Sequence, residues 1–204
     1  METIRHTLKA RLLRDERGIT SVEFAMVCTV FFLIIFGITD FGRALWIWNM
    51  AAKATQAGVR YAVVNDYAAI NLTTLNGTDF APIGTPVPVG GVTPNPTICT
   101  INGCGASIAA PTPNNIDLDA FQNIVREMQK FYPDITDVDV VVEYLHVGLG
   151  FAGNPVGPDV DPVVTVRLRD MDFAFLTPGL SGLTDALTLP PFIASLTGED
   201  GRSS

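Results

Sequence analysis

The sequence predicts an α+β protein in which a long N-terminal transmembrane and stalk helix precedes a small extracytoplasmic domain, with an antiparallel sheet and one packed helix. Three observations carry this prediction. An uncharged apolar run fills positions 24–39, and helical spacing then continues without proline as far as Pro82. After position 115, one amphipathic segment is followed by β-branched, partly alternating stretches that are typical of strands.

Charge is distributed unevenly along the chain. Residues 1–18 hold five Lys/Arg and three acids, a net charge of +2, whereas the other 186 residues hold eight Lys/Arg and eighteen acids, a net charge of −10. An acidic body argues against nucleic-acid binding, which needs a basic face on the folded part. A basic N-terminus fits the cytoplasmic flank of a membrane helix, so we expect everything past Trp48 to lie outside the cytoplasm.

The apolar run is long enough to cross a membrane once its flanks are included. Phe24 to Thr39 alone is shorter than the ~20 residues a bilayer requires. A helix from Val22 to Ile47 would be ~39 Å long at ~1.5 Å per residue. Glu23 then lies at one boundary, while Asp40 and Arg43 lie near the other, three residues apart and able to neutralise each other. Trp46 and Trp48 follow at the position of an aromatic belt.

A secretory signal peptide is the alternative for this segment. It would have a basic start, an apolar centre and small residues near Ala51 and Ala52. The apolar segment is long for a signal peptide, and Asp40 and Arg43 interrupt the approach to any cleavage site. These features favour a retained helix.

The helical pattern extends well beyond the membrane. Apolar and small residues recur at three- and four-residue intervals: Phe41, Leu45, Trp48, Ala52, Thr55, Val59 and Ala62. We therefore predict one helix from about Thr20 to about Val64. It would be ~65 Å long, so its outer half must pack on the following domain or on neighbouring copies.

Positions 65–115 are rich in proline and glycine, which predicts a surface loop region. Cys99 and Cys104 lie in it, on either side of the turn-forming pair Asn102-Gly103. In an oxidising compartment a local disulfide is favoured over free thiols. Metal binding is disfavoured because no second ligand pair lies nearby.

Positions 116–204 are predicted to form the α+β domain. A helix opens near Ile116, with Asn115 or Asp117 as its N-cap, and ends before Pro133. Strands are expected at 137–147 and 162–173, joined by a Gly/Pro-rich hairpin loop. The tail is expected to return as a further strand, near 187–189 or near 192–196.

No catalytic site is predicted. His146 is the one histidine outside the basic N-terminus, and it lies in a strand without a partner that the sequence identifies. The segment Gly179-Leu180-Ser181-Gly182 is one residue short of a nucleophile elbow and lacks the strand–turn–helix context.

No cofactor or metal site is predicted either. Gly148 to Gly153 spells G-x-G-x-x-G after a strand, but Pro155 and Pro158 prevent the helix that must hold a pyrophosphate. Hairpin glycines are the better interpretation. The acids within 134–139, 159–161 and 170–172 do not have the spacing of a calcium loop, so a solvated sheet face is expected.

The stretch RGITSVEF, residues 17–24, resembles the prepilin cleavage signature of type IV-type pilins. Gly18 would precede the cut, Ile19 would become residue one, and Glu23 would be the fifth. Over roughly 11–64 the chain resembles the TadE-like family of tight-adherence (Flp) pilus systems. The resemblance rests on RDERGITSVEFAM, on Asp40-Phe41-Gly42-Arg43 and on the alanine-rich run 51–62.

The resemblance implies a minor pilin or pseudopilin, because the major pilins of these systems are far shorter. It implies single-pass insertion into a bacterial inner membrane with the N-terminus in the cytoplasm, and processing after Gly18 by a prepilin peptidase. Gly18 and Ile19 would form the processing site, and Glu23 and Phe24 would act in assembly. The implied partners are the peptidase, other pilin or pseudopilin subunits, the inner-membrane assembly platform and lipid. Entry into the pilus and priming of it both stay open.

Elementary electrostatics gives Glu23 a purpose in this scheme. Cutting before Ile19 creates an ammonium group at the membrane surface, where an unpaired charge is costly. A carboxylate four residues along the helix can pair with its own ammonium or with that of a neighbour. The simpler alternative is a glutamate that only interacts with the helix dipole in the first turn.

The sequence is also compatible with two other functions. A membrane-anchored adhesin or binding module would use the proline-rich loop and its disulfide to contact a surface or glycan. An anchored enzyme is disfavoured because the sequence offers no nucleophile–base pair.

Overall fold

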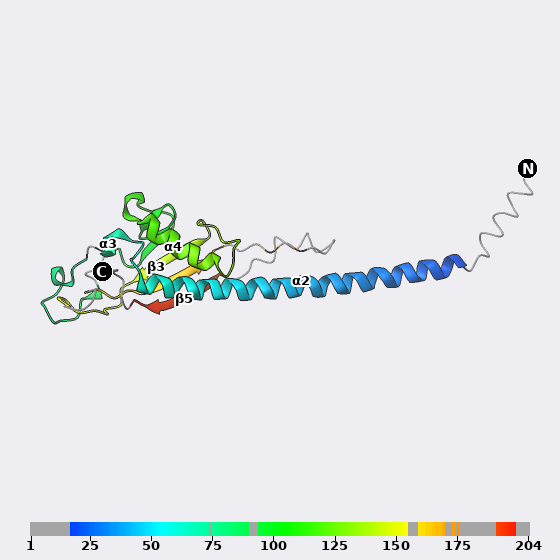
Figure 1. Ribbon diagram of the computed structural model, residues 1–204, viewed down its shortest axis with the longest axis horizontal. Helices are drawn as coiled ribbons and strands as arrows, with labels where there is room; N and C mark the ends of the chain where they lie inside the picture. Colours follow the sequence, from blue (N-terminus) through cyan, green and yellow to red (C-terminus); the bar gives the residue numbers. More distant parts are fainter. Residues whose placement is uncertain are drawn as a thin grey trace, which may run out of the picture. The chain divides into compact units, whose positions relative to one another are not determined.

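A computed structural model describes residues 17–73, 75–89, 94–154, 159–169, 173, 175 and 191–198. The chain divides into two compact units, one of residues 1–44 with 174–184 and one of residues 45–173 with 185–204, which we call the head. The predicted combination of a long apolar helix with an antiparallel sheet and a packed helix is confirmed (Figure 1).

Helix α2 runs from Arg17 to Val64, 48 residues without an interruption. It begins three residues before the predicted start at Thr20 and ends at the predicted residue. No proline occurs in it, and the two threonines of its apolar stretch form hydrogen bonds within the helix. The hydroxyls of Thr29 and Thr39 donate to the carbonyls four residues earlier, at 2.8 and 2.9 Å. Such bonds let a helix carry threonine within an apolar stretch.

The head contains a five-stranded antiparallel sheet of order β2-β1-β3-β4-β5. Its strands are β1 (Thr97–Thr100), β2 (Gly103–Gly105), β3 (Val140–Leu145), β4 (Val163–Leu168) and β5 (Phe192–Thr197). The hairpin β3–β4 is in register over six pairs, from Val140 opposite Leu168 to Leu145 opposite Val163. β5 corresponds to the second of the two predicted tail positions, and 187–189 lies outside the described residues.

Helix α4 (Leu118–Gln129) is the predicted packed helix. Of the two expected N-caps, Asp117 is used, and its carboxylate accepts from the N–H groups of Asp119 and Ala120 at 3.0 Å. The predicted apolar stripe is buried: Phe121, Ile124, Val125 and Met128. Capping and amphipathic spacing therefore fix this helix locally.

The segment 65–115 holds more regular structure than its composition predicts. It contains the short helices α3 (Ile70–Thr73), η1 (Gly77–Asp79) and η3 (Pro113–Asn115), and it supplies β1 and β2 to the sheet. Both strands are too short to show a period in the sequence. They exist because β1 pairs with β3, a contact between segments about forty residues apart that local propensity cannot reveal.

The core of the head lies between the sheet and its helices. Val164, Val166 and Leu168 of β4 are buried with the stripe of α4 and with small residues of α2. Gly58 marks the closest approach: a Cβ added there would lie 2.7 Å from Cγ of Met128 and 3.5 Å from Cγ1 of Val166. The alanine-rich part of α2 is therefore slender because α4 and β4 lie against it.

We predict that Gly58→Leu destabilises the head. The larger side chain must displace Met128, and overpacking of this kind lowers the free energy of unfolding by about 1–3 kcal/mol. Denaturant unfolding of the full chain in detergent micelles, followed by tryptophan fluorescence, measures this because Trp48 packs against Phe192 with ring centroids 4.8 Å apart. Gly37→Leu is the control, since a Cβ there meets nothing within 4 Å. Equal stability of the two variants would contradict the prediction.

Candidate functional site

The predicted processing site lies in the first turn of α2. The backbone of Gly18 and Ile19 is helical, because the helix begins at Arg17. Glu23 and Phe24 follow on the same helix with exposed side chains. Ile19 and Glu23 are four residues apart, so they occupy one helix face. A new amino terminus at Ile19 would therefore lie on the same face as the Glu23 carboxylate.

The part of α2 that follows is covered with apolar side chains. The large apolar residues from Val22 to Phe41 are all exposed. An apolar surface of this extent is not typical of a protein surrounded by water. The helix is long and apolar enough to cross a membrane.

One ion pair interrupts this apolar surface. Nη1 of Arg43 lies 3.3 Å from Oδ1 of Asp40, and the two residues are three apart on the helix. Asp40 is only 1% exposed, whereas Arg43 is partly exposed. Pairing cancels both charges, which is the arrangement that a carboxylate in an apolar setting requires.

The end of α2 is anchored in the head through the backbone of Ala68, which is fully buried. Its N–H donates to the hydroxyl of Tyr144 at 2.9 Å, and its carbonyl accepts from the N–H of Asp117 at 2.8 Å. The sulfur of Cys104 lies 3.6 Å from the same carbonyl. Ala68, four residues after the end of the helix, thus contacts β3, the N-cap of α4 and the β1–β2 hairpin.

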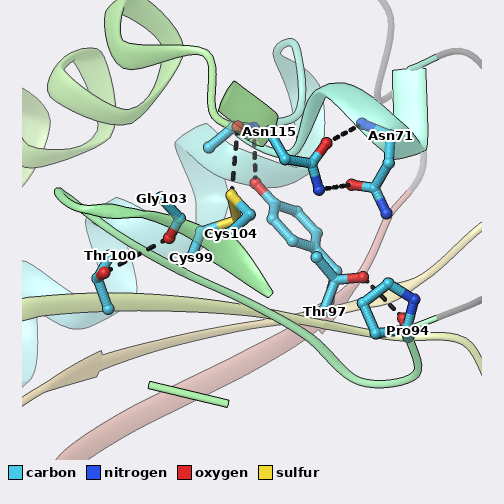
Figure 2. The surroundings of a disulfide bond; sticks show 10 residues. Asn71, Pro94, Thr97, Cys99, Thr100, Gly103, Cys104 and Asn115 are labelled. Atoms are coloured by element: carbon cyan, nitrogen blue, oxygen red, sulfur yellow. Dashed lines mark hydrogen bonds between the residues drawn. A yellow bond between two sulfur atoms is a disulfide. The ribbon is translucent and has the colours of Figure 1, made fainter. Parts of the chain in front are cut away.

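Cys99 and Cys104 form a disulfide across the β1–β2 hairpin, and both are fully buried (Figure 2). They are directly opposite each other in the register of the two strands. The side-chain amides of Asn71 and Asn115 pair close by, at 3.0 Å. The disulfide therefore fixes the hairpin that lies against Ala68.

The buried His146 ties two loops to the sheet. Its backbone N–H and C=O are both bonded to the side-chain amide of Asn95, at 3.0 and 2.8 Å. Its Nε2 lies 3.4 Å from the carbonyl of Val87. Burial raises the pKa of the nearby Asp161 carboxyl, and the charge of His146 lowers that pKa in part. These contacts to backbone and amide groups are structural.

The G-x-G-x-x-G segment serves as a loop. Gly148, Gly150 and Gly153 all have positive φ, and a Cβ on Gly150 would lie 2.3 Å from the carbonyl oxygen of Asp159. The carboxylate of Asp159 accepts from the N–H groups of Gly77 and Asn154, at 2.8 and 2.9 Å. Glycine is required here by the turn.

The remaining candidates are the acidic clusters considered as a metal site and the segment 179–182 considered as a nucleophile elbow. Among the described residues, no group of three His, Cys, Asp or Glu side chains is arranged to hold a metal ion. The acids at 170–172 and the segment 179–182 lie outside those residues.

Sequence reasoning missed the residues that dock the helix. Gly58 and Ala68 are small residues among other small residues, and Tyr144 looks like any aromatic residue in a strand. A glycine in the middle of a helix costs helix stability and so suggests close packing. That signal does not single out Gly58, because a Cβ on Gly37 or Gly42 of the same helix meets nothing within 4 Å.

The helix α2 is similar in sequence to a known protein family. Residues 18–60 match the family model described as TadE-like protein. This segment of the chain is similar to TadE-like proteins. The match begins at Gly18 and covers about a fifth of the chain. No curated protein and no solved structure is significantly similar to the chain.

The TadE-like match contains most of the features found on α2. It includes Glu23, the pair Asp40 and Arg43, and the close contact at Gly58, and it ends four residues before the helix does. The sheet of the head lies wholly outside the match. The family therefore describes the helix, and the head must be understood from its own structure.

We predict that Tyr144→Phe destabilises the head at neutral pH. The variant leaves the buried N–H of Ala68 without its acceptor, which costs about 1–3 kcal/mol. Burial also raises the pKa of Tyr144 far above its ordinary value. The unfolded chain then loses this proton near pH ~10 while the folded chain keeps it, so wild-type stability falls as the pH rises further. The variant should lose less stability than wild type between pH ~9 and pH ~11, as measured by denaturant unfolding. Unchanged stability at neutral pH would contradict the role of the hydroxyl.

Reduction of the disulfide should weaken the same anchorage. For a loop of six residues, the chain-entropy estimate gives a loss of about 2 kcal/mol in the free energy of unfolding. Unfolding of wild type with and without dithiothreitol tests this, with the double variant Cys99→Ala/Cys104→Ala as a second measure. Cys28→Ala is the matched control because Cys28 is a free thiol on α2. An equal effect of dithiothreitol on wild type and on the double variant would exclude the disulfide as its cause.

Proposed function

We propose that this protein is a minor pilin or pseudopilin that takes part in assembling or priming a tight-adherence type IV-type pilus. The observation that carries the proposal is the start of the TadE-like match at Gly18, within the first turn of an exposed apolar helix. In this proposal the chain is anchored in a bacterial inner membrane. A prepilin peptidase cuts the bond between Gly18 and Ile19.

Charge supports the proposed orientation. Five Lys/Arg lie in the first eighteen residues, whereas the head, residues 45–173 with 185–204, holds seven Lys/Arg and sixteen acids. Basic flanks remain on the cytoplasmic side of a membrane helix, so the N-terminus would lie in the cytoplasm and the head outside. The disulfide in the head agrees with an oxidising compartment.

Glu23 has a defined part in this function. The cut leaves an ammonium group on Ile19, and Glu23 lies one helical turn further along the same face. Pairing with the ammonium of the same chain would lower the cost of placing both groups in the membrane. Pairing with that of a neighbouring subunit would also set the axial position of one helix against the next.

The exposed apolar surface supports assembly with lipid and with other subunits. Side chains from Val22 to Phe41 can be covered by lipid before assembly and by neighbouring helices afterwards. The partners in this proposal are the peptidase, other pilin or pseudopilin subunits and the inner-membrane platform.

Processing after Gly18 is tested by Gly18→Ala in cells that contain the peptidase. Wild type should lose ~2 kDa, eighteen residues of ~110 Da each, and the variant should keep its full size and fail to support pili. Gly37→Ala is a matched control on the same helix and should be processed normally. N-terminal sequencing of the mature protein should begin at Ile19, and an intact Met1 would overturn the proposal.

Glu23→Ala separates assembly from processing. The variant keeps the Gly18–Ile19 sequence that the peptidase would cut, so the ~2 kDa loss should still occur. Pilus formation should fall, because the new ammonium group on Ile19 lacks its carboxylate. Glu23→Asp keeps the charge and should restore part of the function. Normal piliation of Glu23→Ala would contradict the assembly role of the carboxylate.

An adhesin is the second candidate, favoured by apolar side chains on the loops of the head. Ile83 is 78% exposed, and Phe151 and Val89 are also exposed beside the bridge between Pro86 and Phe151. Ile83→Ser/Phe151→Ser should then abolish attachment to a surface without affecting pili. Deletion of the proline-rich segment 85–110 is not a suitable test of the adhesin function, because the deletion would also remove strands β1 and β2 from the sheet.

A further inference from the structure

Strand β5 is an edge of the sheet that carries no protection among the described residues. It is paired with β4 along all six of its residues, and its sequence, FIASLT, has no charge and no proline. The opposite edge differs, because β2 has only three residues and Cys104 is bridged there by Thr112. Proteins usually block a long edge strand with charges, proline or a covering segment.

The free backbone groups of β5 can be identified from its pairing. Gly198 donates its N–H to the carbonyl of Pro162, so it faces β4. Because residues of an antiparallel strand alternate, Leu196, Ala194 and Phe192 also face β4. The N–H and C=O groups of Ile193, Ser195 and Thr197 then point away from the sheet. No hydrogen bond joins these outward groups to any described residue.

A groove runs beside this edge, between β5 and α2. Its volume is about 320 Å³, and its wall on the sheet side is the whole stretch from Phe192 to Leu196. The wall on the helix side is one face of α2: Ala52, Thr55, Gln56, Val59 and Arg60. Leu196 is 41% exposed here, although its neighbours on the same face of β4 are buried. The groove therefore offers apolar surface together with a row of backbone groups that bond to no described residue.

Charge indicates what kind of segment the groove would accept. Arg60 is the one charged residue that lines it, and Arg60 is exposed without an ion pair among the described residues. The head as a whole is strongly acidic. A cation in this position favours a partner that brings a carboxylate.

A second copy of the chain does not supply such a segment from its described edges. β5 has no acidic residue, and β2 is bridged by Thr112. An extended segment of a different polypeptide can satisfy both requirements at once, with alternating apolar residues toward α2 and a carboxylate near Arg60.

We propose that the groove between α2 and β5 is a docking site for an extended, acidic segment of another protein, which adds to the sheet as a sixth strand beside β5. The segment would lie ~4.8 Å from β5 and extend over ~20 Å. It would exchange hydrogen bonds with Ile193, Ser195 and Thr197. The site is a property of the head and does not depend on processing at Gly18 or on the pilus.

Site-specific crosslinking in the native host tests the proposal on the full chain. The photo-crosslinker p-benzoylphenylalanine replaces Gln56, which faces the groove, or Arg126 on α4 as a control position. Light should give an adduct with a different polypeptide from position 56 and none of that mass from position 126. Mass spectrometry of the adduct should locate the crosslink in an extended segment that contains Asp or Glu.

Substitutions in the free edge distinguish strand addition from ordinary contact. Ser195→Pro removes an outward N–H but no backbone bond to β4, so the head should fold while the adduct falls by about tenfold. It also removes the 2.8 Å hydroxyl bond to Thr165 of β4, which Ser195→Ala removes as well, so the alanine variant controls for that loss. Ser195→Ala keeps the N–H and should leave the adduct unchanged. Arg60→Glu should lower the yield of the adduct, and Arg60→Lys should leave it unchanged. This second pair of variants tests the proposal even if Ser195→Pro does not fold.

Three results would overturn the proposal. The first is an adduct between two differently tagged copies of this chain, which would identify the occupant as the protein itself. The second is the absence of any light-dependent adduct at position 56. The third is an adduct whose yield is the same in wild type, Ser195→Pro and Arg60→Glu.

Discussion

The backbone of Ala68 is the point on which the head depends. Its N–H donates a hydrogen bond to the hydroxyl of Tyr144 on β3, and its carbonyl accepts one from the N–H of Asp117 at the start of α4. The disulfide sulfur of Cys104 contacts the same carbonyl. A buried backbone N–H and a buried C=O each need a hydrogen-bond partner, and here the two partners come from different elements. The end of the long helix, the sheet, the packed helix and the hairpin are therefore fixed by one residue without a functional side chain.

Close packing of α2 follows from the same constraint. Once its end is fixed at Ala68, its last turns lie against α4 and β4, where Gly58 leaves room for Met128. Small residues replace large apolar ones along this stretch because their neighbours are protein side chains. Further toward the N-terminus the same helix exposes large apolar side chains, as a helix in contact with lipid or other helices does.

The features with functional meaning lie on surfaces, and the buried polar groups have structural roles. His146 and Asp159 hold loops through backbone and amide contacts. The apolar face of α2 and the edge of β5 that no described residue covers can each be reached by another molecule. This distribution agrees with the proposed function in pilus assembly.

The sequence by itself determined the elements whose signals are local. The apolar run, the period of α2, the cap at Asp117 and the hairpin of β3 and β4 all follow from spacing within one segment. The stretch proposed as the processing site and Glu23 can also be read from the sequence, because they are defined by position along the chain. Only the tertiary structure decided that β1 and β2 join the sheet, that Ala68 unites four elements and that β5 is left at an open edge. These depend on contacts between residues far apart in sequence, and short strands without a hydrophobic period carry no local record of their partners.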